Sequence, residues 1–295
     1  MLISRAFLLV CRAWRMVLWL YFVNFSGGLL VLLPAYATLQ KQTGSSLEYL
    51  KLLNNFDYTV YSDFMQNSQS AIDPLLSVGS WLGVLYLVGS IFFSGGILLS
   101  VSPSAELRQP FRLSRFLPAC IQFFGRFFRL FLSISGLILV VAVFWMLVGF
   151  VVGTSLSDTA NEKDMIWVFL ICLFFFSLVT LFLLCVGDCA KILLFRHDET
   201  RVFLVFRQAM RLVWTHFLLI FGFYLLLMSM GAACFAIYFL IDSWIVTRGW
   251  LSIAALFLFQ QLFIFSRVFL KVWTLATALQ LVTSREGQPA LYRPV

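Results

Sequence analysis

Residues able to carry out chemistry are sparse along this chain. Its two histidines are His197 and His216, and neither has cysteines or carboxylates at the spacing of a zinc site. The acidic residues that follow His197 directly are more typical of a solvated turn. The sequence contains no H-E-x-x-H, P-loop or G-x-S-x-G motif. We therefore expect no enzyme activity, no cofactor, and no catalytic or metal-binding residues.

The cysteine pattern also offers little chemistry. Cys185 and Cys189 lie four residues apart, so they share one face of a helix and could hold a metal ion together. Cysteines in a membrane helix more often serve as small apolar packing residues, and we favour that interpretation. All six cysteines fall in apolar or amphipathic stretches, which argues against a disulfide framework. They are Cys11, Cys120, Cys172, Cys185, Cys189 and Cys234.

Polar side chains within or at the ends of apolar segments are the best functional candidates. Asp188 and Lys191 are three residues apart on one expected helix and can pair with each other or with cations that end the last apolar segment. Ionisable groups at membrane depth are costly and often functional. A position near a helix end nevertheless favours a structural salt bridge or snorkelling over a substrate site. The candidate intramembrane polar cluster consists of Asp188, Lys191, Gln260, Gln261, Arg267 and Lys271.

The elements that must position these residues are long apolar helices. Hydrophobic residues make up 62% of the 295 positions and charged residues only 12%, whereas an ordinary soluble domain has about 25% charged residues. About 20 apolar residues span a bilayer as a helix, and uniform apolarity excludes the alternating pattern of a membrane β-barrel. We therefore predict an all-α integral membrane bundle of about six transmembrane helices. The segments that lack Asp, Glu, Lys and Arg are 16–40, 74–105, 130–157, 165–187, 212–241 and 249–266.

The asymmetry of charge predicts the orientation of the chain. Of the 21 basic residues, 17 fall at the termini or in the connections after the second and fourth spans, and the opposite side holds four basic and eight acidic residues. The positive-inside rule places the basic side, and with it both termini, in the cytoplasm. We expect a multi-pass protein of the bacterial cytoplasmic (inner) membrane. Its first apolar run is longer than that of a signal peptide and is expected to be retained.

Basic residues on the cytoplasmic side follow a helical period. In the segment 111–130 they fall within about 100° of one another, while Phe116, Phe123 and Phe127 occupy a separate face. Such a helix suits the membrane interface, and we expect it to lie along the inner surface before the chain turns into the third span.

A second amphipathic helix of the same kind is expected after residue 200. Asp198, Glu199 and Thr200 are predicted to cap its N-terminus. The N-terminal segment repeats the pattern with Arg5, Arg12 and Arg15. The basic residues expected to contact lipid are Arg112, Arg115, Arg126, Arg129, Arg201, Arg207 and Arg211.

The order of these segments indicates three hairpin units within a single membrane domain, residues 1–295. Each unit would contain a basic amphipathic helix, a span outward, an external loop and a span back, over residues 1–105, 106–197 and 198–295. The alternative is that any six-span protein with basic cytoplasmic connections has this pattern. The external loop 41–73 is the one sizeable polar stretch and is too short for an independent domain.

The chain resembles an uncharacterised group of six-span bacterial inner-membrane proteins. Their membrane region is similar to the one fused to some glycerophosphodiester phosphodiesterases. The resemblance implies a six-helix bundle and implies no activity, because the phosphodiesterase barrel is absent from this sequence. It rests on Ala13-Trp14-Arg15 leading to Pro34, Phe56-Asp57, Asp63-Phe64, Ser94-Gly95-Gly96, Phe116, Phe123–Arg126, Gly187-Asp188-Cys189-Ala190-Lys191, and Gln260-Gln261 with Arg267.

Two functional classes follow from these patterns. The first is a non-catalytic scaffold that binds membrane lipids, above all anionic ones, or membrane protein partners. The second is a transporter or lipid-handling permease. A transporter should contain a polar cavity at mid-depth that reaches Asp188 and Gln260, whereas a scaffold should have a solid apolar interior with seams of small residues. Nucleic acid is not an expected partner, because topology and anionic lipid account for the net charge of +8.

Overall fold

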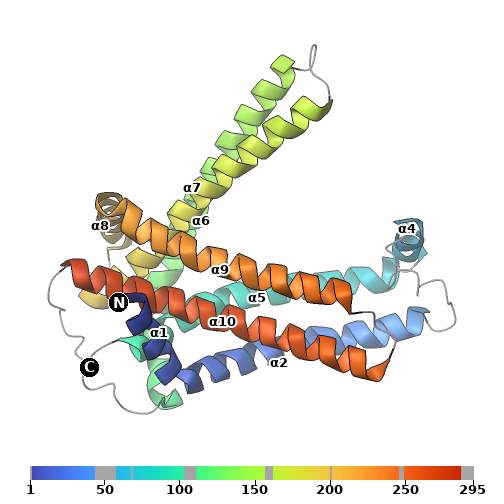
Figure 1. Cartoon of the computed structure of the whole chain (residues 1–295), viewed down its shortest axis with the longest axis horizontal. Coiled ribbons are helices and arrows are strands. Elements are labelled where there is room, and N and C mark those ends of the chain that lie inside the picture. The colour runs from blue at the N-terminus through green and yellow to red at the C-terminus, as the bar shows by residue number, and fades with distance from the viewer. Residues whose placement is uncertain are drawn as a thin grey trace. The chain divides into compact units, whose positions relative to one another are not determined.

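The computed structural model describes residues 2–43, 58–67, 69–102, 111–156, 162–199, 201–245 and 249–286. Every regular element in these ranges is a helix (Figure 1). The helices are α1 (Leu2–Arg12), α2 (Trp14–Thr43), α4 (Tyr58–Asn67), α5 (Gln69–Val101), α6 (Leu113–Leu156), α7 (Glu162–His197), α8 (Val202–Thr215), α9 (Phe217–Trp244) and α10 (Trp250–Glu286). The predicted all-α fold is confirmed.

Six of these helices are long and apolar enough to cross a membrane: α2, α5, α6, α7, α9 and α10. Each contributes a candidate span of at least 25 residues, more than the roughly 20 that a bilayer requires. The protein is therefore a multi-pass membrane protein, as the apolar segments predict.

The chain forms two compact units, whose boundaries fall inside α5, α9 and α10. Unit 1 consists of Met1–Ala13, Ile91–Met230 and Lys271–Val295, and unit 2 of Trp14–Ser90 and Gly231–Leu270. Nearly all of the buried apolar side chains belong to unit 1. Among the described residues of unit 2, only Met16, Val17, Leu20 and Val268 are buried to that degree. The protein core therefore lies in unit 1.

Helix α6 differs from the prediction for the segment 111–130. The amphipathic pattern predicts a turn before the third span, but α6 runs without a break from Leu113 to Leu156. At 1.5 Å per residue its 44 residues are about 66 Å long, roughly twice the thickness of the hydrocarbon core of a bilayer. The first part of α6 is therefore continuous with the third span, with Pro118 close to the helix start. That this part lies along the inner membrane surface stays a prediction.

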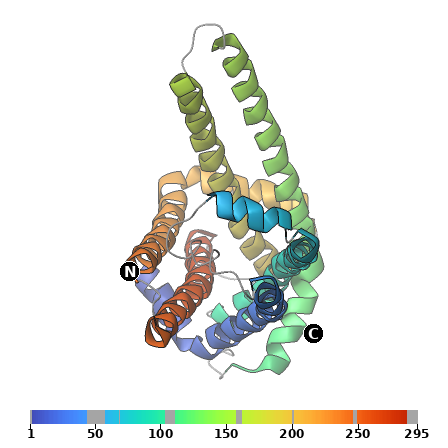
Figure 2. The same ribbon diagram turned by 90° about the vertical axis from the view of Figure 1, so that its right-hand side faces the viewer.

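The apolar face of this segment packs inside unit 1. Phe116, Phe123 and Phe127 are fully buried. The ring centroid of Phe123 lies 5.1 Å from that of Phe195, near the end of α7. Figures 1 and 2 show α6 and α7 side by side, and the two helices pack against each other. The amphipathic pattern of 111–130 therefore comes at least in part from contacts within the protein.

Glycine permits the close contact between α5 and α6. A Cβ atom at Gly95 would lie 2.9 Å from the backbone oxygen of Ala119 and 3.3 Å from the Cβ of Phe123. At Gly96 it would lie 2.5 Å from a ring carbon of Phe116. Small residues let membrane helices approach this closely, so this is the kind of seam expected of a solid interior.

Two further junctions in unit 1 have the same arrangement. Helix α7 packs on α8, with the rings of Phe182 and Trp214 centred 6.2 Å apart. Helix α10 contacts α1, with the rings of Phe7 and Trp273 centred 5.3 Å apart. At each junction a returning span contacts a basic segment of a different expected repeat. The arrangement fits the three-repeat hypothesis, which remains a prediction.

The expected external loop 41–73 is partly helical. Helix α2 extends to Thr43, α4 occupies Tyr58–Asn67, and α5 begins at Gln69. Polar residues at the ends of α2 and α5 therefore extend these helices. Phe56 and Asp57, which contribute to the family resemblance, lie outside the described residues.

Candidate functional site

Helix α7 brings Asp188 and Lys191 together. The Nζ atom of Lys191 donates a hydrogen bond to Oδ1 of Asp188 at 2.8 Å. Both side chains are largely shielded, with exposed fractions of 20% for Asp188 and 22% for Lys191. Of the partners that the sequence allows, Asp188 thus pairs with the next turn of its own helix. Helix α7 thus carries a shielded ion pair inside unit 1.

Asp188 also lines a recess between three helices of unit 1. Helix α7 contributes Cys185, Asp188 and Cys189, while α9 contributes Tyr224 and neighbouring apolar residues. Helix α10 contributes two hydroxyl groups, those of Thr274 and Thr277, besides apolar side chains. The Thr277 hydroxyl donates to the backbone oxygen of Trp273 at 2.8 Å, within its own helix.

The recess is small in the state that the structure describes. It has room for about one water molecule, and most of its wall is apolar. Small-molecule sites in proteins usually enclose roughly 300–1,000 Å³. The recess can therefore hold a water molecule or a small ion beside Asp188, but it does not enclose a larger substrate.

Lys271 is the second cation near Asp188. It lies at the start of the α10 portion of unit 1, and the charges of Asp188 and Lys191 both act on it. Two lysines and one carboxylate thus share this region of unit 1. The structure shows the Asp188–Lys191 pair, and the wider polar cluster stays a prediction.

The other three members of the predicted cluster belong to unit 2 and have partners there. Gln261 accepts a hydrogen bond from the Tyr21 hydroxyl at 2.8 Å. Gln260 donates to the Tyr238 hydroxyl at 3.4 Å. The guanidinium of Arg267 lies 5.9 Å from the ring centroid of Phe263. Gln260 and Gln261 therefore connect spans within unit 2, whereas Arg267 contacts a ring of its own helix.

Asp198 has a different role from the predicted one. It follows the last residue of α7 with φ 50°, a left-handed conformation that often ends helices. Its carboxylate forms an ion pair with Arg126 of α6, although 59% of its side chain is exposed. The N-cap of α8 is Arg201, without a side-chain capping bond. The predicted capping by Asp198 or Glu199 is therefore not observed, and Thr200 lies outside the described residues.

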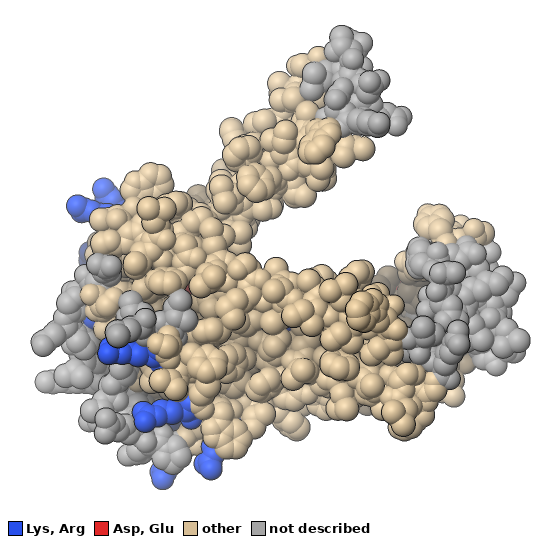
Figure 3. Space-filling view, in the orientation of Figure 1, with Lys and Arg blue, Asp and Glu red and all other residues tan. Residues whose placement is uncertain are grey.

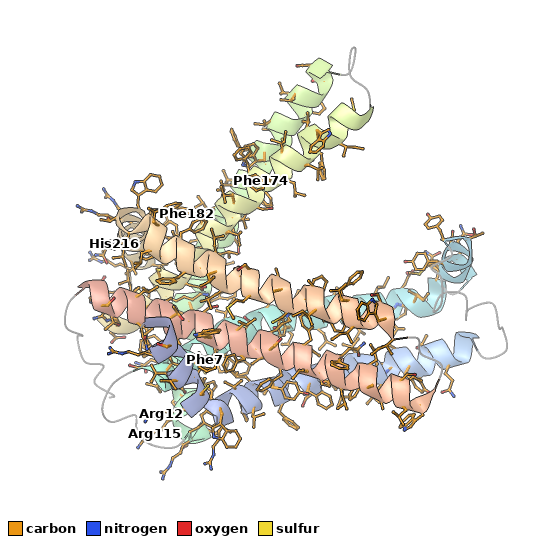
Figure 4. All side chains as sticks on the ribbon, viewed as in Figure 1. Phe7, Arg12, Arg115, Phe174, Phe182 and His216 are labelled. Atoms are coloured by element: carbon orange, nitrogen blue, oxygen red, sulfur yellow. The ribbon has the colours of Figure 1, made fainter. Side chains whose placement is uncertain are left out.

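Most of the basic residues predicted to contact lipid are exposed. Figure 3 shows Lys and Arg side chains gathered near α1, the start of α6 and α8, and Figure 4 shows Arg12 and Arg115 pointing outward. Arg126 is the exception, because it is half-buried between Asp198 and the Phe123 ring. The exposed members of the set are Arg112, Arg115, Arg129, Arg201, Arg207 and Arg211.

Sequence reasoning did not identify the residues that surround Asp188 from other helices. Tyr224, Thr274 and Thr277 are isolated polar residues in apolar segments, and their contribution to one recess depends on how α9 and α10 pack. The spacing of Cys185, Asp188 and Cys189 on one helix face is the only local signal for this site. No cluster of three or more potential metal ligands occurs among the described residues.

Comparison with known proteins adds no further assignment. No family model, no curated protein and no solved structure matches the chain. The resemblance to six-span inner-membrane proteins therefore remains a prediction.

Proposed function

We propose that the protein is a non-catalytic scaffold of the bacterial cytoplasmic membrane, with both termini inside, that binds anionic lipids through its basic helices. The observation that carries the proposal is the exposure of arginines on α1, α6 and α8. An exposed arginine near an anionic membrane surface contributes roughly 1 kcal/mol of binding. Several such residues together would hold a shell of anionic lipid, or an acidic segment of a membrane protein partner.

The interior of unit 1 supports a scaffold over a transporter. Glycines of α5 and α7 lie closely against α6, and the core consists of aromatic and aliphatic side chains. The recess beside Asp188 has room for about one water molecule. A solid interior is suited to holding neighbouring molecules at a surface.

Lipid retention tests the proposal directly. Full-length protein purified in mild detergent should carry anionic phospholipid that native mass spectrometry detects. Replacing Arg112, Arg115 and Arg129 by Gln should lower the amount of anionic lipid retained, whereas the matching Lys variants should keep most of it. Equal retention of anionic and zwitterionic lipid by the unaltered protein would contradict the proposal.

Cysteine labelling tests the orientation. In a Cys11→Ser background, an impermeant maleimide should label a cysteine at position 60 in intact cells. A cysteine at position 198 should be labelled only after the cells are opened. Labelling of both positions under the same condition would exclude the six-span arrangement with both termini inside.

A transporter or lipid-handling permease is the second candidate, and the Asp188 recess is the observation that favours it. In a transporter the recess must open to water during the cycle, which would expose the buried thiols of Cys185 and Cys189. In a scaffold these thiols should stay unreactive toward a hydrophilic maleimide in the native protein, while the exposed Cys11 reacts. Reaction of Cys185 or Cys189 would support the transporter.

A further inference from the structure

Helix α8 has one face buried in the protein and another that is exposed and rich in arginine and aromatic residues. Val205, Ala209 and Val213 form the buried face, where α8 packs against α7 and α6. Phe203 and Trp214, by contrast, are 82% and 72% exposed. Tryptophan and basic residues are both typical of the membrane interface. The exposed face of α8 is therefore a candidate contact with lipid.

The two rings lie on the same side of α8 at opposite ends. They are 11 residues apart, which at 100° and 1.5 Å per residue places them about 20° apart around the axis and about 17 Å apart along it. Arg207 and Arg211 project at about 40° and 80° on the same scale, so both lie to one side of the line between the rings. One side of the helix thus carries an aromatic group at each end and two cations in between.

The chain connection places one end of this face at the membrane boundary. Trp214 is three residues before Phe217, where the apolar span of α9 begins. Leu218, in the first turn of that span, is 87% exposed and available to lipid. Tryptophan is enriched at the level of the lipid headgroups because its ring is apolar and its N–H is polar. We therefore expect Trp214 at headgroup level whichever way α8 points.

We propose that α8 lies parallel to the membrane surface, with Phe203 and Trp214 inserted at headgroup level and Arg207 and Arg211 holding the phosphate groups of anionic phospholipids. Only this orientation gives Phe203 the same apolar surroundings as Trp214, because a helix projecting away from the membrane would leave Phe203 in water. Charge supports an anionic partner, since α8 contains two arginines and no acidic residue. This proposal specifies where the lipid binding of the proposed function takes place.

The binding mode differs from that of an ordinary amphipathic surface helix. In such a helix the apolar face enters the lipid and the basic face remains near the headgroups. In α8 the apolar face is already occupied by the protein core. The lipid contact is made by a second face that has no continuous apolar stripe, so it depends on two rings and two arginines.

Site-specific quenching tests the orientation of α8. Phe203→Cys and, as a matched control on the same helix, Gln208→Cys are labelled with a small fluorophore in full-length Cys11→Ser protein reconstituted in phospholipid vesicles. Gln208 is exposed and lies about 140° around the helix from Phe203. We expect brominated lipid to quench the probe at 203 and aqueous iodide to quench the probe at 208. Iodide quenching of both probes, without quenching by brominated lipid, would overturn the proposal and leave the face free for an acidic protein partner.

A second measurement tests the role of the arginines. The probe at position 203 should be quenched more by brominated phosphatidylglycerol than by brominated phosphatidylcholine in mixed vesicles. Each arginine should enrich the anionic lipid by up to roughly fivefold. The enrichment should be lost in Arg207→Gln/Arg211→Gln and kept in Arg207→Lys/Arg211→Lys. An unchanged ratio in the Gln variant would contradict the assigned phosphate contacts. If the whole protein still retains anionic lipid in that case, the proposed function stands and this location is wrong.

Discussion

Units 1 and 2 are built from the same kind of apolar helix, but nearly all of the side chains that protein atoms bury belong to unit 1. In unit 1, α6 and α7 interlock through Phe123, Phe127 and Phe195, which are shielded by other protein atoms. In unit 2, side chains such as Phe22 and Trp81 are largely exposed on the protein surface. Lipid can solvate such side chains as well as a protein interior does. Burial within the protein therefore marks specific packing, and apolar composition alone does not.

Helix α5 contains this difference within its own length. Gly95 and Gly96 lie in unit 1 and leave no free space for a Cβ atom. Gly79 and Gly83 lie in unit 2, and a Cβ atom at either would meet nothing within 4 Å. Glycine is therefore required for packing in the unit 1 part of α5 and is not required in the unit 2 part.

The largest effect is expected from removing a core ring. Phe123→Ala should lower the free energy of unfolding by about 3–5 kcal/mol, since it leaves a cavity in a closely packed interior. Phe22→Ala, at an exposed position of unit 2, is the matched control and should cost under about 1 kcal/mol. Thermal unfolding of both variants in detergent measures the difference. Equal losses would show that the two units are packed alike.

The next largest effect concerns the shielded ion pair. Asp188→Ala strands the charge of Lys191, which costs roughly 3–5 kcal/mol for a fully buried pair and under about 1 kcal/mol for an exposed one. The partial exposure of both side chains places the expected loss near 2 kcal/mol. Asp198→Ala, which removes the more exposed pair with Arg126, should cost under about 1 kcal/mol. Thermal unfolding in the same detergent compares the two variants.

A double variant separates stranded charge from lost contacts. Asp188→Ala/Lys191→Ala should recover part of the stability lost in Asp188→Ala, because no unpaired charge is left by this change. The contrary outcome is that the stability losses of Asp188→Ala and Lys191→Ala simply add in the double variant. That result would mean that Lys191 does not become an unfavourable unpaired charge when Asp188 is removed.

A smaller effect, with opposite signs in the two units, is expected from glycine replacement. Gly95→Ala should destabilise by about 1 kcal/mol, because overpacking costs roughly 1–3 kcal/mol and the better helix propensity of Ala returns about 1 kcal/mol. Gly83→Ala should be neutral or stabilising by up to about 1 kcal/mol. Thermal unfolding of the two variants measures these effects. Equal stabilisation by both changes would contradict the difference in packing between the two units.

The smallest effect is expected from a polar contact in unit 2. Tyr21→Phe removes the hydrogen bond to Gln261 and keeps the ring, which lies 5.9 Å from that of Phe265. Hydrogen bonds between membrane helices contribute on average about 0.6 kcal/mol. The expected change in unfolding temperature is therefore close to the limit of measurement. A loss above about 2 kcal/mol would show that unit 2 is held together by polar contacts.

Local features of the structure are predictable from the sequence. Six long apolar segments identify the six spans because a helix satisfies its own backbone in lipid. The pair of Asp188 with Lys191 follows from a spacing of three residues on one helix. Arg126 and Asp198 are 72 residues apart, so no local pattern indicates that they meet. The residues around Asp188 cannot be predicted from the sequence for the same reason, since Tyr224 and Thr277 lie on other helices.

Amphipathic patterns are harder to interpret in a membrane protein. Helical periodicity shows that a helix such as 111–130 or α8 has two different faces. It does not show whether each face contacts water, lipid or protein. On α6, the face that looked suited to lipid packs in the core. On α8, the rings that remain exposed lie on the arginine-bearing face, where periodicity alone would place water.

The side chain of Ile134 on α6 fills the space beside Gly187 on α7. A Cβ atom at 187 would lie 2.5 Å from the terminal methyl of Ile134 and 3.8 Å from its Cγ1. Valine at 134 lacks that terminal methyl, so alanine at 187 could be accommodated beside it. In a genetic screen, a defect caused by Gly187→Ala should be suppressed by Ile134→Val. Among related sequences, the sizes of these two residues should vary inversely.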